Sequence, residues 1–350
     1  MQQPLSTSGR IAIGGTLAFA IAACSVDRPA APVTPPAFVG RPNANVLPAS
    51  AYTLYTPIQG GRFTDVNDSN LIVGYAYAGY SGNRAVVMSL AKSWYWLSQG
   101  TATHSSAEAV NQAGQIVGQA GNNPAYWPSR LSDPVRLNDA GIALDVNDNG
   151  LIVGYFEPAA NARQAFVWDS QSGSVQLLPP PKGYAVTQAI AVNNDNAILG
   201  WSWVAGDPSF PHYPTKTVLW RRARSNSPWV PRAVSGMIGY DIGANEQTVG
   251  QEAWAGRPAF GTPDYAGLIC PYCDEGWALA LSTTGLAAGW EKDAGYTPTP
   301  FVADLVGGYT ELPNTAGSAH GVNACGLVVG EVRSWPAPNY VAAAIWDPGC

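Results

Sequence analysis

The sequence predicts an all-β fold built from seven similar units, and two observations lead to this prediction. The stretch at residues 145–155, which reads DVNDNGLIVGY, recurs in recognisable form seven times between residues 64 and 331. The glycines that close successive copies are 36 to 50 residues apart, a period that is typical of repeat arrays. Because each copy has the residue types of short strands, this period favours the blades of a seven-bladed β-propeller.

Each copy has the pattern of a β-hairpin. Two short apolar runs flank the four residues 147–150, which read NDNG. An Asn side chain can bond to its own backbone and a Gly takes positive φ without strain, so this tetrapeptide suits a tight turn. Glu246 is the one residue other than Gly or Asn at the position that needs positive φ, which makes the fifth turn the least regular. The residues at the Asn position, each with the Gly seven residues later, are Asn67 and Gly74, Asn111 and Gly118, Asn147 and Gly154, Asn193 and Gly200, Gly243 and Gly250, Ser282 and Gly289, and Asn323 and Gly330.

Two more strands are predicted after each hairpin. Residues 165–168, which read AFVW, are the clearest third strand, and residues 175–178 are predicted to form the fourth. The seventh copy has no fourth strand of its own, whereas residues 52–57, ahead of the first copy, resemble a fourth strand. We therefore expect this N-terminal strand to complete the last blade and close the ring, which removes open sheet edges.

Residues 1–23 are predicted to be a lipoprotein signal peptide. Arg10 precedes an apolar run over residues 11–23, which is shorter than a membrane-spanning helix but suits a secretory signal. The run ends in Ile-Ala-Ala-Cys, which resembles the lipobox of bacterial lipoproteins, with Cys24 as the lipid-modified residue. The alternative is a plain signal peptide with an incidental Cys.

The remaining chain divides into a tether and a propeller. Residues 24–50 are rich in Pro and Ala and are predicted to form an extended tether, and residues 51–350 the seven-bladed β-propeller. By resemblance to lipoprotein sorting, Ser25 in place of Asp favours the outer membrane, on its periplasmic or surface side. The net charge of -6 argues against nucleic acid and against a polybasic attraction to anionic membranes, so we expect membrane contact through the lipid anchor only. We expect a monomer.

Four cysteines follow Cys24, and two disulfides are expected in an exported chain. Cys325 lies in the turn between strands one and two of the last blade, and Cys350 follows strand three. Both positions are at the same end of a meandering blade, so we pair Cys325 with Cys350 and Cys270 with Cys273. The latter motif resembles the active site of glutaredoxins, but no βαβ pattern surrounds it, and a structural disulfide is favoured.

No cofactor or metal ion is expected. Residues 145–150 could be read as a calcium loop, but Phe156 stands where a bidentate Glu would be needed. The chain has one CxxC and no His at a matching spacing, which argues against zinc. None of the three His residues has neighbours that suggest a catalytic triad.

The loops between strands two and three are the expected recognition surface. They carry aromatic residues, which provide a large contact area and stack on sugars or fill pockets in partner proteins. Residues directly after the closing Gly, such as Trp201 and Trp290, are expected to continue strand two and pack between blades. The candidate binding residues are Tyr80, Phe210, Tyr213, Trp254, Trp335 and Tyr340. The same loops carry carboxylates that could form a catalytic pair, namely Glu157, Asp207, Glu252, Glu291, Asp293 and Glu331.

With its Asn-x-x-Gly-x-Ile-Val-Gly hairpin and Ala-Phe-Val-Trp strand, the chain resembles the extracellular HAF-repeat proteins, a bacterial family regarded as β-propellers. The resemblance covers about residues 60–347 and is specific at 109–118, 145–168 and 321–330. The name-giving His-Ala-Phe is replaced by Gln-Ala-Phe at residues 164–166. The resemblance implies a fold and an extracellular location, but no defined activity.

These observations predict a lipid-anchored envelope propeller that acts as a binding or scaffold module for a protein or glycan. The alternative is a carbohydrate-active enzyme, a glycosidase or lyase, on the same platform. A third possibility is a structural envelope component without a ligand.

Overall fold

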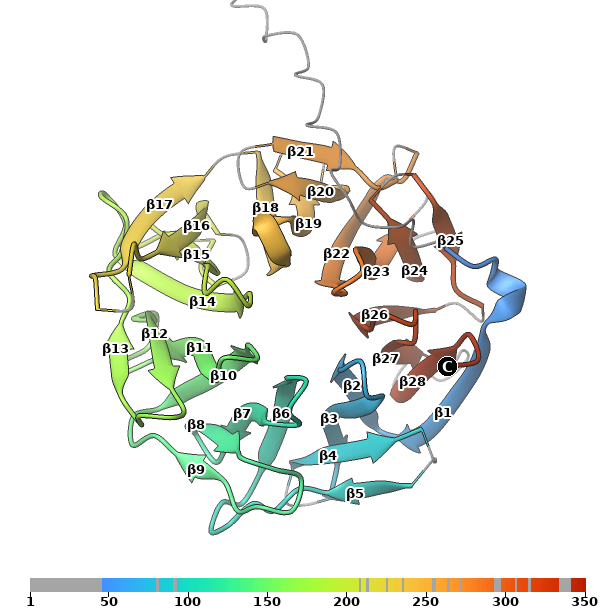
Figure 1. Cartoon of the computed structure of the whole chain (residues 1–350), viewed down its shortest axis with the longest axis horizontal. Coiled ribbons are helices and arrows are strands. Elements are labelled where there is room, and N and C mark those ends of the chain that lie inside the picture. Colours follow the sequence, from blue (N-terminus) through green and yellow to red (C-terminus); the bar gives the residue numbers. More distant parts are fainter. Residues whose placement is uncertain are drawn as a thin grey trace, which may run out of the picture. The chain divides into compact units, whose positions relative to one another are not determined.

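The structure is a computed structural model that describes residues 46–350 except positions 80–81, 91–92, 208, 212–213, 225, 235, 254–255, 263–264, 271, 293–296, 306, 314–315 and 334–340. The described chain forms seven four-stranded antiparallel sheets arranged in a ring (Figure 1). The predicted seven-bladed β-propeller is therefore confirmed. Within the described residues, no helix is both long and apolar enough to cross a membrane.

The blades follow one another along the chain. Blade one has β2 (Gly61–Val66), β3 (Leu71–Tyr77), β4 (Asn83–Ser89) and β5 (Trp94–Trp96), and blade two has β6 (Ser105–Val110), β7 (Ile116–Ala120), β8 (Asn123–Trp127) and β9 (Val135–Arg136). Blade three has β10 (Gly141–Val146), β11 (Leu151–Phe156), β12 (Gln164–Asp169) and β13 (Val175–Leu177), and blade four has β14 (Val186–Val192), β15 (Ile198–Trp203), β16 (Lys216–Arg221) and β17 (Val230–Val234). Blade five has β18 (Met237–Ile242), β19 (Thr248–Glu252), β20 (Pro258–Thr262) and β21 (Tyr265–Leu268), and blade six has β22 (Glu275–Leu281), β23 (Leu286–Lys292), β24 (Thr299–Asp304) and β25 (Tyr309–Glu311). Blade seven has β26 (Gly317–Val322), β27 (Val328–Arg333), β28 (Val341–Asp347) and β1 (Thr53–Gln59), and two short 3-10 helices span Ala49–Ala51 and Ala244–Glu246.

Blade seven combines both ends of the described chain. Its strand order is β1-β28-β27-β26, and β1 pairs antiparallel with β28, with Thr53 opposite Asp347 (Figure 1). A disulfide joins Cys325, in the turn between β26 and β27, to Cys350, which follows β28. The second disulfide joins Cys270 to Cys273, so both predicted pairings are confirmed.

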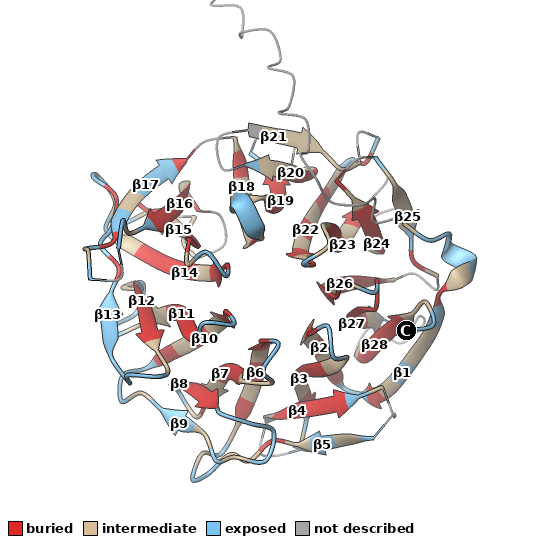
Figure 2. Cartoon of the chain, in the orientation of Figure 1, coloured by how far each residue is buried: buried red, intermediate tan, exposed pale blue. Residues whose placement is uncertain are grey.

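The first strand of each blade, hereafter the inner strand, lies nearest the centre of the ring (Figure 1). Because neighbouring strands are antiparallel, the turn between strands one and two lies on one side of the ring, which we call the turn face. The connection between strands two and three lies on the opposite side, the loop face. The buried residues lie mostly in the inner three strands of each blade (Figure 2).

The core fills the spaces between adjacent blades. In one cluster, Val153 and Val167 of blade three pack with Ile198 and Trp220 of blade four, and all four are buried. In three blades the third-strand Trp also links blades by a hydrogen bond, whereas the buried Nε1 of Trp168 has no partner within the described residues. The indole Nε1 donates to a carbonyl just after the fourth strand of the preceding blade, from Trp127 to Ser98 (2.7 Å), Trp220 to Pro179 (2.7 Å) and Trp346 to Pro313 (3.1 Å). Trp127, Trp220 and Trp346 therefore both pack in the core and bond to the preceding blade.

A β-bulge in every inner strand explains the closing Gly of the repeat. In blade three the pairing shifts between Ala143 and Asp145, so Leu144 is the extra residue. The bulge brings the Ile142 carbonyl oxygen over Gly154, where an added Cβ would lie only 2.0 Å from it. The corresponding distances at all seven closing glycines are 1.9 to 2.2 Å. These glycines are required by close backbone approach.

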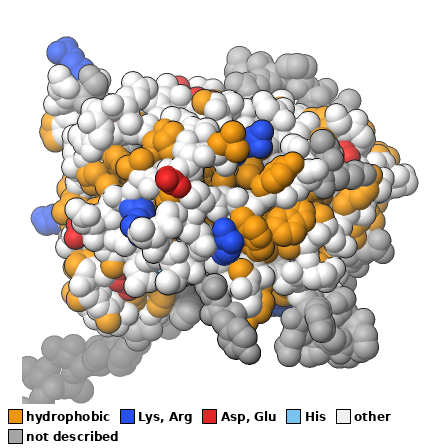
Figure 3. Space-filling view, turned by 90° about the horizontal axis from the view of Figure 1, so that it is seen from below, with side chains coloured by type: hydrophobic (Ala, Val, Ile, Leu, Met, Phe, Trp, Pro, Cys, Tyr) orange, Lys and Arg blue, Asp and Glu red, His pale blue; other side chains and the backbone are white. Residues whose placement is uncertain are grey.

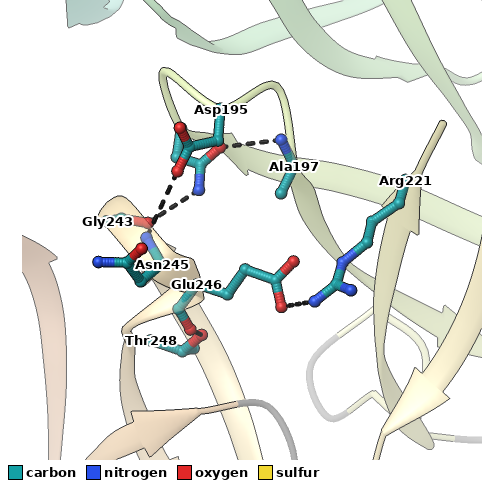
Figure 4. A network of polar contacts seen from close by, with 8 residues as sticks. Asp195, Ala197, Arg221, Gly243, Asn245, Glu246 and Thr248 are labelled. Carbon is teal, nitrogen blue, oxygen red and sulfur yellow. Dashed lines mark hydrogen bonds and ion pairs between the residues drawn. The ribbon is translucent and has the colours of Figure 1, made fainter. Parts of the chain in front are cut away.

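The turns have the predicted backbone conformation. The residue three positions after the Asn position has positive φ, as at Gly150 (77°) and Asn196 (62°). In the irregular fifth turn Glu246 also has positive φ (59°), and so does Asn245. Figure 4 shows how this turn is held: Glu246 forms an ion pair with Arg221, and the Asn245 N–H donates to Asp195 (3.4 Å). Both partners belong to blade four, so this turn is fixed by its neighbour.

Candidate functional site

A cavity of about 420 Å³ lies on the turn face, at the centre of the ring. It is lined by the ends of the inner strands and by the turns that follow them, with residues from all seven blades. Among the described residues that line it there are six Asp and no Lys, Arg or His. The six are Asp65, Asp68, Asp145, Asp148, Asp195 and Asp241. The sequence interpretation did not identify this acidic cavity.

Three of these aspartates, at the ends of inner strands, bond to the next blade in the same way. Asp65 accepts the N–H of Val66 (2.7 Å) in its own blade and that of Val110 (2.8 Å) in blade two. Asp145 and Asp241 make the same pair of bonds in blades three and five, each reaching the next blade at 2.7 Å. The corresponding residues of blades two, four, six and seven are Ala109, Ala191, Ala280 and Gly321. The alternation of Asp with small residues at this position is visible in the sequence and marks the blades whose Asp bonds to the next blade.

The position of these aspartates also changes their ionisation. Burial raises the pKa of Asp65 to about 7, although the N–H groups of Val110 and Val66 act in the opposite direction. Burial likewise raises the pKa of Asp241 to about 6, and burial and the charge of Asp241 raise that of Asp145 well above its usual value. Near neutral pH the cavity therefore carries less negative charge than six aspartates would suggest.

The raised pKa of Asp65 predicts a pH-dependent mutational effect. A carboxyl group whose pKa is higher in the folded state stabilises the fold below its unfolded pKa, near 4, and loses this contribution as pH rises through about 7. Water in the cavity reduces the effect, so we expect the destabilisation caused by Asp65→Ala to be about 2–4 kcal/mol smaller at pH 8 than at pH 4. Urea unfolding at the two pH values measures this difference.

The control removes a side chain that does not titrate. Asn111 is 4% exposed and donates to the Asn147 carbonyl (3.0 Å) on the same face of the ring. Asn111→Ala should cost the same at pH 4 and pH 8. An Asp65→Ala cost that is equally independent of pH would contradict the prediction.

The repeated Asn forms a ladder around the turn face. Each Asn Oδ1 accepts N–H groups of its own turn, and its Nδ2 donates to the carbonyl of the equivalent residue in the next blade. The donations run from Asn67 to Asn111 (2.9 Å), Asn111 to Asn147 (3.0 Å), Asn147 to Asn193 (2.8 Å), Asn193 to Gly243 (2.8 Å) and Asn323 to Asn67 (3.2 Å). The Asp and Asn of the motif are thus explained by structure, because they hold the blades together.

Closer to the loop face, an aromatic group spans three blades. Trp201 of β15, Tyr240 of β18, and Trp277 and Trp290 of blade six are half-buried and form what we call the aromatic arc. Ring centroids are 4.9 Å apart from Trp201 to Tyr240, 5.2 Å from Tyr240 to Trp277 and 5.3 Å from Trp277 to Trp290. Trp201 is fixed by a hydrogen bond from its Nε1 to the Gly239 carbonyl (2.7 Å). The Nε1 of Trp277 is buried and has no hydrogen-bond partner within the described residues.

In blades seven, one and two, polar side chains occupy the strand positions that correspond to those of the aromatic arc. We call this group the polar sector; it consists of Arg62, Ser106, Glu108, Ser318, His320 and Glu331. Arg62 Nε lies 2.6 Å from Glu331 Oε2, and Arg333 lies 3.4 Å from the other oxygen of Glu331. Burial would raise the pKa of Glu331, but the hydrogen bond and charge of Arg62 hold it below its usual value. The Glu331 carboxylate is therefore ionised and fixed between two guanidinium groups.

The two groups have different chemistry because they occupy the same repeat positions with different residues. Bulge residues are Thr64, Glu108 and His320 in the polar blades, but Leu144, Ile190, Tyr240 and Leu279 in the others. Gln188 and Gln251 are polar exceptions within the apolar blades, and they bond to Arg163 (2.8 Å) and to the Gly256 carbonyl (2.9 Å). The loop-face end of the inner strands thus has an aromatic and aliphatic side and a charged side.

One predicted binding residue can be placed. Phe210 is half-buried and contacts Trp203 (5.0 Å between ring centroids) and Arg163 (5.1 Å), so it packs against the ends of blades three and four. The other candidates, Tyr80, Tyr213, Trp254, Trp335 and Tyr340, lie outside the described residues, as does Cys24. The residues of the aromatic arc that follow a closing Gly, Trp201 and Trp290, continue strand two as expected.

Four of the six loop carboxylates have partners of their own, and Glu291 is buried in β23. Glu157 pairs with Arg163 (3.1 Å), Glu252 with Arg257 (3.1 Å), and Asp207 accepts hydrogen bonds from Ser209 and Thr215. Glu331 alone joins the polar sector, and Asp293 lies outside the described residues. Among the described residues, no group of three or more His, Cys, Asp or Glu is arranged to hold a metal ion.

A second aromatic surface lies on the outside of the ring. Trp94, Tyr95 and Trp96 form β5, and Tyr95 is 56% exposed. Figure 3 shows hydrophobic side chains gathered on the side of the ring where β5 lies. Trp94 and Trp96 contact each other edge to face (5.1 Å), and Arg84 lies over Trp96 (4.9 Å). These contacts fix the outer aromatics against blade one.

Comparison with known proteins identifies the fold alone. No family model matches the chain, and no curated protein matches its sequence. The chain is similar to the β-propeller domain of the Trilobed protease from Pyrococcus furiosus, with 13% identity and a TM-score of 0.53 over 84% of this chain and 94% of that domain. It is also similar to puromycin hydrolase (12% identity, TM-score 0.58, 80% of this chain) and to Pyrococcus horikoshii acylaminoacyl peptidase (13%, 0.54, 82%). The chain spans about half the length, 51%, of each of these two enzymes.

Proposed function

We propose that this protein is an exported binding module that holds a carbohydrate at the loop-face end of its inner strands. The observation that carries the proposal is the aromatic arc, in which Trp201, Tyr240, Trp277 and Trp290 remain half-buried although they belong to the two innermost strands of their blades. Aromatic rings stack on the apolar faces of sugars, which such partly exposed rings can contact.

A sugar also suits the loop-face end of the inner strands, where the aromatic arc lies on one side and the polar sector on the other. Carbohydrates have apolar ring faces and polar edges, so one ligand can contact the aromatic arc with its face and the polar sector with its hydroxyl groups. The residues of both groups stand on strands, and sites built on strands are more rigid than sites built on loops. This rigidity lowers the entropy cost of binding.

The same proposal includes the location of the protein. A lipid anchor at Cys24 and an extracellular or periplasmic propeller, as in the HAF-repeat proteins that the sequence resembles, would place the site where envelope glycans occur. Metabolic labelling with a palmitate analogue, compared between wild type and Cys24→Ser, tests the anchor.

The test of the binding function is calorimetric titration of the full chain with neutral and acidic oligosaccharides. We expect saturable binding of at least one, and about a 10-fold loss of affinity in Trp277→Leu, because leucine keeps apolar volume but removes the stacking ring. Trp94→Leu on the outer strand β5 is the control and should bind as wild type does.

Each outcome bears on the proposal. Binding that is lost equally in both variants, or no binding of any saccharide, would reject the site and leave a protein partner as the remaining candidate. Release of shorter products from the bound oligosaccharide would replace the binding function with the carbohydrate-active enzyme.

A further inference from the structure

We propose that the polar sector binds a carboxylate group, so that the ligand of this protein is a uronate-containing oligosaccharide. This inference rests on the proposed carbohydrate function and specifies its substrate class. The proposal rests on hydrogen-bond donors near Arg62 that have no acceptor within the described residues.

Arg62 presents a guanidinium group that is only partly used. Its Nε donates to Glu331 Oε2 at 2.6 Å, while its terminal amino groups form no hydrogen bond within the described residues. The side chain is 34% exposed, so a ligand can reach it. The planar guanidinium matches a carboxylate through two parallel hydrogen bonds, which makes Arg62 a suitable carboxylate ligand.

Two buried polar atoms beside Arg62 lack a partner. Ser318 is 9% exposed and its Oγ has no hydrogen bond within the described residues, and the same holds for the buried Nε2 of His320. Ser318 stands opposite Glu331 in the sheet, and His320 is the bulge residue of the same inner strand. Buried polar groups are nearly always bonded in folded proteins, so these two indicate that a ligand supplies their partner.

The protonation states agree with a donor role. Burial and the charge of Arg62 lower the pKa of His320 to about 3, so the ring is neutral near pH 7 and can donate from one nitrogen. Tyr75, whose hydroxyl is a further donor, stands opposite Arg62 in the sheet. The polar sector therefore offers several donors to one ligand group.

Three of the four carboxylate oxygens of the sector already accept a hydrogen bond. Glu331 receives Arg62 on one oxygen and Arg333 on the other, and Glu108 receives the Ser106 hydroxyl at 2.6 Å. Burial raises the pKa of Glu108, which reduces its repulsion of an anion. A ligand with acceptor oxygens suits these donors, and a carboxylate brings two such oxygens with a charge that complements Arg62.

The experiment compares one sugar chain with and without its charge. The full-length protein is titrated calorimetrically with an oligogalacturonide and with the same oligosaccharide as its methyl ester. We expect the acid to bind at least 10-fold more tightly, since hydrogen bonds to a charged group are stronger than those to a neutral one.

The variant Ser318→Ala separates recognition from folding. Its hydroxyl has no partner within the described residues, so the thermal unfolding midpoint should not fall, whereas affinity for the acid should fall about 10-fold. Ser170→Ala is the matched control, because the Ser170 hydroxyl is also buried and also lacks a partner in the described part of the chain, but it follows β12, away from the inner strands. It should leave both affinities unchanged.

The failures of the two proposals can be told apart. Equal affinity for acid and ester, or an acid affinity that Ser318→Ala does not change, overturns the carboxylate site but leaves the carbohydrate function in place. If neither sugar binds while citrate binds in a Ser318-dependent manner, the carboxylate site is supported and the saccharide is rejected. If citrate fails as well, both proposals are overturned.

Discussion

Replacing Gly154 with alanine should lower the free energy of unfolding by about 3–5 kcal/mol, although the change adds a single methyl group. The added Cβ would lie 2.0 Å from the Ile142 carbonyl oxygen and 2.9 Å from the Ala143 Cα. Both obstacles are backbone atoms of the bulged inner strand β10, so no side-chain rotation can relieve the clash. The bulge would have to open, and with it the bond by which Asp145 reaches Val192 in blade four.

A second glycine of the same blade is the control. Gly173 has positive φ (73°) in the turn before β13, and a Cβ added there meets no atom within 4 Å. Gly173→Ala should cost only the strain of a left-handed alanine, about 1–2 kcal/mol. Urea unfolding followed by tryptophan fluorescence measures both variants. If the two substitutions prove equally costly, close backbone approach is not the reason for the closing Gly.

The contrast between these glycines indicates which parts of the fold can be predicted from the sequence. The turn Gly and the closing Gly both recur with a fixed spacing from the Asn position, and this spacing is sufficient to count blades and to place the hairpins. The physical reason for the closing Gly could not be read, because the bulge that demands it depends on pairing between two strands. Recurrence therefore identified the position, and only the structure identified its cause.

The candidate site was less predictable than the fold. The sequence interpretation placed recognition in the loops, where Phe210 is the single candidate that the structure describes, and it packs against Trp203 and Arg163. The aromatic arc instead joins residues of three blades, and Tyr240 meets Trp277 because blades five and six are neighbours in the ring. Blade order could be predicted, but the register of the bulged inner strands could not. Which side chains of neighbouring blades come into contact was therefore not predictable.

The polar contacts of the turn face show the same division. The Asn at position 147 was assigned to its own turn, which accounts for its Oδ1 but leaves its Nδ2 unexplained. That amide reaches the next blade, a contact between residues 46 positions apart. A pattern read within one repeat cannot reveal a bond between repeats, although the alternation of Asp and Ala two residues earlier hints that neighbouring blades differ in their roles.

Replacing Asn147 with alanine should therefore destabilise the propeller by about 3–4 kcal/mol. This is more than we expect from losing only the hydrogen bonds within its own turn. Asn147 is 4% exposed, and its Nδ2 donates to the Asn193 carbonyl (2.8 Å) and to Asn196 Oδ1 (2.9 Å). Its Oδ1 accepts the N–H groups of Asn149 (3.1 Å) and Leu151 (2.9 Å). Alanine removes the hydrogen bonds to all four partners. Water cannot replace these bonds at the partner atoms that are buried, so those atoms stay unsatisfied.

Asn149, two residues further on, provides the matched control. Its Nδ2 makes bonds of the same kind to blade four, to the Asn194 carbonyl (2.8 Å) and Asn196 Oδ1 (3.0 Å), but it is exposed. Water can replace these bonds, so Asn149→Ala should cost about 1 kcal/mol or less. Equal costs for Asn147→Ala and Asn149→Ala in urea unfolding would show that the buried ladder adds nothing beyond ordinary turn contacts.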